Sequence, residues 1–165
     1  MRALQIVKYG EIKDSLAFNE VSKPAVQATD VLIEVKAAAI NPIDKSIVLG
    51  NLQGLLPIPF PSTSAYDVSG IVVEKGDDVS NFEIGDLVYS RVPQEQMGTI
   101  AEYVAVTSEA VSKKPGNISF EEAAGIPLAG LTALQSLEFA GIKTNERILI
   151  HAGSGGVGSL AIQYA

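Results

Sequence analysis

A glycine-rich segment at 153–158, Gly-Ser-Gly-Gly-Val-Gly, constrains the fold of this chain more than any other feature. An apolar run at 148–150 precedes it, and a helical pattern of apolar residues follows it. This order predicts a strand at 147–151, a tight turn and a helix start, the setting in which glycines at this spacing bind a dinucleotide. Gly153 would allow the turn, Gly155 would let a diphosphate approach the main chain, and Gly158 would let the helix pack close to the strand. The phosphates would meet free N–H groups at the positive end of that helix. The predicted cofactor-binding residues of the segment are Gly153, Ser154, Gly155, Gly156, Val157 and Gly158.

The first 117 residues are rich in short β-type runs. Runs at 4–7, 31–35, 68–73 and 103–106 carry β-branched residues in partly alternating order, and turn residues separate them. This pattern predicts a barrel or a sandwich. One helix is expected to interrupt it, with Asn41 as cap, Pro42 in the first turn and Gly50 as the stop.

The pattern changes after Gly116. Ser119 and Glu122 form the two ends of a capping box, which predicts a helix start there. A second helix is expected from Pro127 to a left-handed cap at Gly141, with leucines at 128, 131 and 134 on one face. We therefore divide the chain into residues 1–117, mainly β, and residues 118–165, two helices followed by the first β-α unit of a nucleotide-binding domain.

The chain continues for only seven residues beyond Gly158. A parallel strand needs neighbouring strands and cover on both faces, so one strand and a short helix do not make a stable nucleotide-binding fold. We therefore expect a truncated chain, a piece of a protein roughly twice as long. Its apolar tail is expected to be mobile, folded back on the barrel, or buried in a neighbouring copy.

Composition excludes several classes of protein. The net charge of −7 disfavours nucleic acid and acidic membranes as partners, because both require a cationic surface. The sequence has no run of 18 apolar residues and no signal peptide at its N-terminus. It also has no cysteine, so it can form neither a disulfide nor a cysteine-ligated zinc site. A cytoplasmic protein is the expectation.

Six short motifs lie at 38–44, 66–72, 85–88, 98–103, 128–133 and 155–158. Together, in this order and at this spacing, they resemble the medium-chain dehydrogenase/reductase superfamily, specifically its zinc-free quinone-oxidoreductase-like branch. The resemblance covers the whole chain. It implies a GroES-like barrel as catalytic domain, followed by a Rossmann domain that holds NAD(P)H, with the end of a full-length chain returning to complete the barrel.

The residues at the family's zinc positions differ from the ligands that its zinc-dependent members use. Asn41 lies near the first cysteine position of zinc-dependent relatives, and Tyr66-Asp67 replaces their His-Glu pair. The only histidine, His151, lies beside the glycine turn. With no thiolate and one imidazole, we expect no metal site. The resemblance then implies zinc-free hydride transfer from NADPH to a small molecule, a quinone or an α,β-unsaturated carbonyl, with NAD left open.

The resemblance also implies the site residues. Asn41 and Asp44 would lie at the cleft near the nicotinamide and Thr132 would face its amide, while Tyr66 is a pocket-lining candidate. The catalytic candidates are thus Asn41, Asp44 and Tyr66. Each has a structural alternative: a helix cap, a first-turn carboxylate, a core aromatic and, for Thr132, a hydroxyl bonded to the preceding turn.

Asp67 and His151 have structural interpretations as well. Asp67 can bond main-chain amides of a turn, and a histidine at a strand end is more often packed than catalytic. The chain also departs from the branch after Asp44, because relatives often carry Tyr, Arg and Tyr where it has Ser46, Val48 and Leu52. This departure leaves two alternatives open: an enoyl-thioester reductase of the same superfamily, and a non-catalytic binding module. A homo-oligomer is compatible with either.

Overall fold

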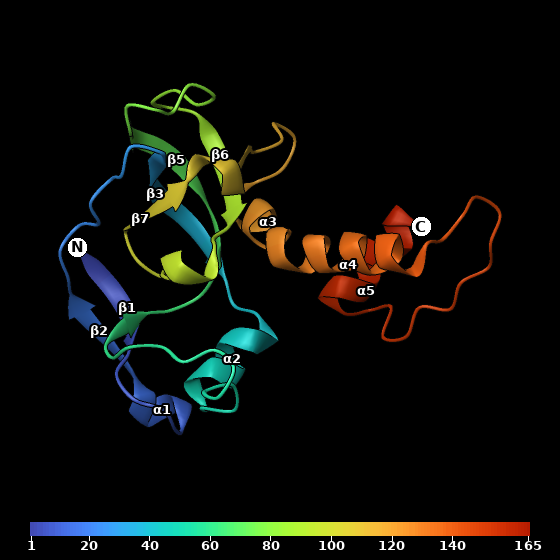
Figure 1. Ribbon diagram of the computed structural model, residues 1–165, viewed down its shortest axis with the longest axis horizontal. Helices are drawn as coiled ribbons and strands as arrows, with labels where there is room; N and C mark the ends of the chain where they lie inside the picture. Colours follow the sequence, from blue (N-terminus) through green and yellow to red (C-terminus); the bar gives the residue numbers. More distant parts are fainter.

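The computed structural model describes residues 1–165. Two antiparallel sheets lie at one end of an elongated molecule, and helices α4 (Pro127–Ala140) and α5 (Gly156–Tyr164) extend from them (Figure 1). The larger sheet has the order β7-β3-β5-β6-β8 and the smaller one β2-β1-β4. The strands are β1 (Arg2–Ile6), β2 (Leu16–Glu20), β3 (Asp30–Ala39), β4 (Ser62–Thr63), β5 (Asp67–Lys75), β6 (Leu87–Arg91), β7 (Tyr103–Thr107) and β8 (Val111–Lys113).

The β-rich prediction for the first 117 residues is confirmed. The four runs expected as strands fall on β1, β3, β5 and β7, with ends that differ by a few residues. Their apolar side chains form one core. Val31, Leu32 and Ile33 are all fully buried, because β3 lies inside the sheet and both of its faces are covered. The core extends through Val68, Val88 and other strand residues to Phe82.

Gly70 allows β3 and β5 to approach closely. A Cβ atom at this position would lie 2.1 Å from the Glu34 carbonyl oxygen and 2.7 Å from Ile33 Cγ2. The register between the two strands shifts nearby, between Val35 and Ala37. A residue without a side chain is therefore required where the strands come together.

Short helices and 3₁₀ turns lie between the strands in the chain. α1 (Ile12–Ser15), α2 (Pro42–Val48) and the 3₁₀ turns at Gln94–Gln96 and Ser108–Ala110 connect strands. The expected capping box begins α3 (Phe120–Ala124): the Ser119 hydroxyl accepts from the Glu122 N–H at 3.2 Å, and the Glu122 carboxylate accepts from the Ser119 N–H at 2.7 Å. α3 packs against β3 and β5. The division at residue 118 stays a prediction.

α4 ends as predicted and packs through small side chains. Gly141 adopts a left-handed φ of 65° at its C-terminus. The buried positions of α4 include Ala129 and Ala133, while Leu131 is 44% exposed. Small side chains on α4 let α5 approach: a Cβ at Gly156 would lie 3.6 Å from Ala129 Cβ.

The strand expected at 147–151 is not formed. Residues 147–150 have no regular structure, and Leu149 is 81% exposed. A strand must exchange hydrogen bonds with a neighbour, and no strand lies beside this segment, whereas α5 forms because helical hydrogen bonds are local. α5 lies along α4 and does not fold onto the sheets (Figure 1). No helix is both long and apolar enough to cross a membrane.

Candidate functional site

The first candidate residues lie where β3 ends and α2 begins. Asn41 occupies the N-cap position of α2, and the Asp44 carboxylate accepts the Asn41 main-chain N–H at 2.6 Å. Both structural alternatives, a cap and a first-turn carboxylate, are therefore realised. Asp44 is buried, and its second carboxylate oxygen, Oδ1, has no hydrogen-bond partner. Burial raises the pKa of Asp44, which the N–H of Asn41 and the charge of Arg91 partly offset.

Asp67 joins this cap to the start of α4. Its Oδ2 accepts the Asn41 side-chain Nδ2 at 2.9 Å, and both of its oxygens accept the Leu128 main-chain N–H, at 3.1 and 3.2 Å. The side chain is 1% exposed. Burial raises the pKa of Asp67 to about 6, against the hydrogen bonds from Asn41 and Leu128. Sequence reasoning anticipated its bonds to main-chain amides but did not include it in the site.

Tyr66 lies beside Asp67 and is also buried, at 1% exposure. The guanidinium carbon of Arg91 lies 5.0 Å from the centroid of its ring. Burial raises the pKa of the Tyr66 hydroxyl, and the charge of Arg91 lowers it. Sequence reasoning missed Arg91. The signal that could have found it is strand pairing, since Asp67 and Arg91 lie opposite each other in β5 and β6.

The structure therefore gathers Asn41, Asp44, Tyr66, Asp67 and Arg91 at one place, where β5 and β6 meet the starts of α2 and α4. Two carboxyl groups there have raised pKa values, beside a phenol and a guanidinium. Such a cluster can orient a polar group and hold a proton near neutral pH.

The three departures from the branch lie mostly inside. Val48 is buried in the core and Leu52 packs against it. The Ser46 hydroxyl donates to the Pro42 carbonyl at 3.1 Å, within α2. These positions contribute packing and local hydrogen bonds to this face of the barrel.

Three main-chain N–H groups at the end of the glycine turn have no acceptor within the helix, while the Gly155 N–H donates to the Ala152 carbonyl at 2.9 Å. The first hydrogen bond of α5 runs from the Ser159 N–H to the Gly155 carbonyl at 2.9 Å, so the N–H groups of 156, 157 and 158 precede it and have no helical acceptor. A Cβ at Gly158 would lie 2.3 Å from the Ala152 carbonyl oxygen, which makes glycine essential there. Ala152, just before the glycines, adopts a left-handed φ of 54°.

A hollow of about 350 Å³ lies beside this turn, between it and α4. Its lining includes Ala133 and Leu137 of α4 with Gly155, Val157 and Gly158 of the turn. Thr132 is exposed and does not line it; its hydroxyl donates to the Leu128 carbonyl at 2.8 Å, the alternative considered above. Ser154 and His151 are also exposed. Residues of the turn could therefore hold a diphosphate group through main-chain amides.

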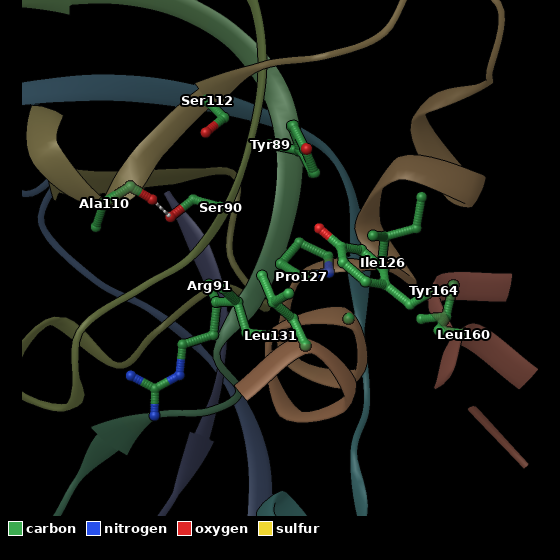
Figure 2. A pocket seen from close by; sticks show the side chains of 12 residues that line it. Tyr89, Ser90, Arg91, Ala110, Ser112, Ile126, Pro127, Leu131, Leu160 and Tyr164 are labelled. Carbon is green, nitrogen blue, oxygen red and sulfur yellow. Dashed lines mark hydrogen bonds between the residues drawn. The ribbon is translucent and has the colours of Figure 1, made fainter. Parts of the chain in front are cut away.

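A second hollow, of about 250 Å³, lies between the sheet, α4 and α5 (Figure 2). Leu131, Leu160 and Tyr164 form its helical wall, and Tyr89 and Ser90 lie on the strand side. The Ser90 hydroxyl donates to the Ala110 carbonyl at 2.7 Å. Figure 2 shows the Arg91 guanidinium turned away from the helical wall. The structure has no group of three or more His, Cys, Asp or Glu side chains that could hold a metal ion.

Comparisons with known proteins agree with this geometry. The family model described as the alcohol dehydrogenase GroES-like domain matches residues 27–116. The 2-methylene-furan-3-one reductase of Solanum lycopersicum is 40% identical over 100% of this chain and 44% of its own length. The quinone oxidoreductase of Coxiella burnetii is 39% identical, with a TM-score of 0.87, and is matched over 99% of this chain and 52% of its own. Escherichia coli quinone oxidoreductase complexed with NADPH is 30% identical, with a TM-score of 0.87, over 99% and 49%. The chain thus spans about half the length of these relatives.

Proposed function

The chain belongs to the medium-chain dehydrogenase/reductase superfamily, among its quinone-oxidoreductase-like proteins, and from this premise we propose that it is the N-terminal half of an NADPH-dependent oxidoreductase. The enzyme would transfer a hydride to a quinone or an α,β-unsaturated carbonyl. The observation that carries the proposal is the set of free N–H groups at the start of α5, beside a position where only glycine fits. A relative of similar structure bound to NADPH supports the choice of cofactor.

The turn would hold the cofactor diphosphate. The N–H groups of 156, 157 and 158 point along the helix axis toward the positive end of the α5 dipole, where an anion is favoured. Gly155 has no close neighbour except the Ala152 carbonyl oxygen, 3.4 Å from a Cβ placed there, so a phosphate can approach the main chain. When bound, the nicotinamide supplies the hydride.

The barrel residues would position the reacting groups. Asn41, Asp44 and Tyr66 form the face that we assign to the nicotinamide and substrate, and placement there would contribute most of the rate. The Thr132 hydroxyl donates to its own helix, which leaves its oxygen lone pairs to accept from the nicotinamide amide. We propose a zinc-free reaction, because a chain with no cysteine and one histidine offers neither the usual ligands nor a cluster of them.

NADPH oxidation by the full-length protein tests this function. We expect turnover with at least one class in a panel of quinones, enones and enoyl thioesters. Gly155→Ala should raise the KM for NADPH, because a methyl group would obstruct the approach of the diphosphate. Gly116→Ala is the matched control, since a Cβ there meets nothing within 4 Å. Tight NADPH binding without turnover would favour the binding module, and reduction confined to thioesters would favour the enoyl reductase.

A further inference from the structure

Asp67 is the buried group that links the two halves of the candidate site. Its carboxylate receives one donor from the Asn41 side chain and one from the Leu128 main chain, on α2 and α4 respectively. These partners lie 26 and 61 residues away along the sequence. Burying a carboxylate costs free energy that apolar packing would not.

The bond to Leu128 acts as a helix cap supplied from another element. Ile126, at the N-cap position of α4, has no capping side chain, and Pro127 has no N–H. The Leu128 N–H is therefore the first donor of α4 in need of an acceptor, and a carboxylate at a helix N-terminus is also favoured by the dipole. Asp67 thus fixes the start of the helix that carries Thr132 and supports α5.

The bond to Asn41 sets the orientation of a side-chain amide. An ionised carboxylate only accepts hydrogen bonds, so it selects the Asn41 nitrogen and directs the amide oxygen elsewhere. We propose that Asp67 is a positioning residue, whose ionised carboxylate holds the Asn41 amide in one orientation and ties it to the start of α4. The positioning role rests on the proposed function. The pairing of Asp67 with Asn41 and with Leu128 through hydrogen bonds does not.

The charges around Asp67 allow the orientation of the Asn41 amide to depend on pH. The charge of Asp44 on α2 raises the pKa of Asp67, and the charge of Arg91 on β6 lowers it. Tyr66 is the preceding residue in the chain, and the charge of Glu95 raises its pKa. α4 contributes only main-chain N–H. With the pKa of Asp67 at about 6, the carboxylate accepts from both partners above that pH. Below it, the protonated oxygen becomes a donor, and the Asn41 amide can turn its oxygen inward.

NMR of the ¹⁵N-labelled chain tests the pairing without any assay of activity. The Asn41 side-chain NH₂ and the Leu128 main-chain N–H should titrate together, with a common midpoint near pH 6. Asp67→Asn should abolish both responses. Asp30→Asn is the matched control, because Asp30 is a buried carboxylate that accepts from the Gln27 N–H and the Gln96 side chain, away from this cluster. Signals that move independently in the natural chain, or that still titrate in Asp67→Asn, would overturn the proposal.

The positioning role is tested in the full-length protein. Asp67→Asn should raise the KM for NADPH by about tenfold, as expected for one misplaced hydrogen bond, and should remove any pH dependence of that KM near 6. An unchanged KM and pH profile would overturn the positioning role. Failure of the natural full-length protein to bind NADPH would instead reject the proposed function, and the NMR result would still decide the pairing.

Discussion

At the scale of single residues, the buried charge of Asp67 lowers the free energy of unfolding at neutral pH. Its pKa is about 6 in the folded chain against an ordinary value of 3.8, a difference worth roughly 3 kcal/mol. The folded state binds this proton more tightly than the unfolded state, so the contribution favours folding below pH 3.8 and is lost as the pH rises through about 6. We expect Asp67→Asn, which stays neutral, to be more stable than the natural chain at pH 7 by up to about 3 kcal/mol.

Chemical denaturation at pH 4 and pH 7 measures this difference. Comparing the two proteins at each pH cancels the effect of Asp86, Glu102 and Glu121, whose pKa values are lowered in both. At pH 4 the two proteins should have nearly equal free energies of unfolding, since an amide and a protonated carboxyl are similar in size. A variant that loses stability relative to the natural chain between pH 4 and pH 7 would contradict the prediction.

The family resemblance identified part of this cluster. Asn41, Asp44 and Tyr66 were chosen from the sequence, and the structure brings them together. The local roles of Asn41 as a cap and of Asp44 as a first-turn carboxylate follow from neighbouring residues and could be predicted. The hydrogen bond from Leu128 to Asp67 and the approach of Arg91 to Tyr66 depend on how distant elements pack, which a spacing pattern does not contain.

At the scale of elements, two glycines of the turn have different roles. Gly158 is required for close packing, whereas Gly155 has room for a Cβ and lies where the diphosphate would bind. In Gly158→Ala the new methyl would meet the Ala152 carbonyl oxygen at 2.3 Å and Gly153 Cα at 2.8 Å, both main-chain atoms that cannot move aside cheaply. We expect the turn to shift at a cost of about 1–3 kcal/mol. Hydrogen exchange of the α5 amides should become faster.

Gly155→Ala is the control for this prediction. Its φ of −82° suits any residue, and the nearest atom to a new Cβ is 3.4 Å away. Exchange in α5 should stay close to that of the natural chain. Equal effects of the two substitutions would show that α5 is not held by the close approach at Gly158.

Gly70 provides a test of the contact between β3 and β5. A Cβ there would overlap the Glu34 carbonyl oxygen at 2.1 Å, and the strands would have to separate inside the sheet. We expect Gly70→Ala to lower the free energy of unfolding by about 2 kcal/mol or more. Gly116→Ala, with open space around it, should change the stability by no more than about 0.5 kcal/mol. Thermal denaturation of both variants and of the natural chain measures these differences in stability.

Elements with local signals could be predicted and those that depend on neighbours could not. The capping box of α3 and the left-handed end of α4 follow from a few adjacent residues, and both are confirmed. The strand at 147–151 was wrong because its residue pattern describes an interior strand, while the structure gives it no sheet to join. The packing of α5 on small residues of α4 could not be predicted, because it depends on the approach of a second helix.

At the scale of the whole molecule, the part that contains the two sheets (the sheet domain) and the extension formed by α4 and α5 differ in how much of their apolar surface is buried. The sheets enclose a continuous core from Ile6 to Val111. The extension buries little: Phe139, Leu149 and Tyr164 are 96%, 81% and 62% exposed. Apolar surface of this kind is usually covered by further protein, and the relatives have about as many residues again beyond the matched half. The sheet domain should therefore keep its structure under conditions that release the extension.

Limited proteolysis with chymotrypsin tests this difference. The segment 142–155 has no helix or strand and exposes Leu149, so its main chain can enter a protease active site with little unfolding. We expect the first cleavage after Leu149, yielding a fragment that contains the sheet domain and resists further digestion, identified by its mass. Leu149→Ala should shift early cleavage toward Phe139 without changing the stability of that fragment. First cleavage within the strands would mean instead that the sheets depend on the extension for their stability.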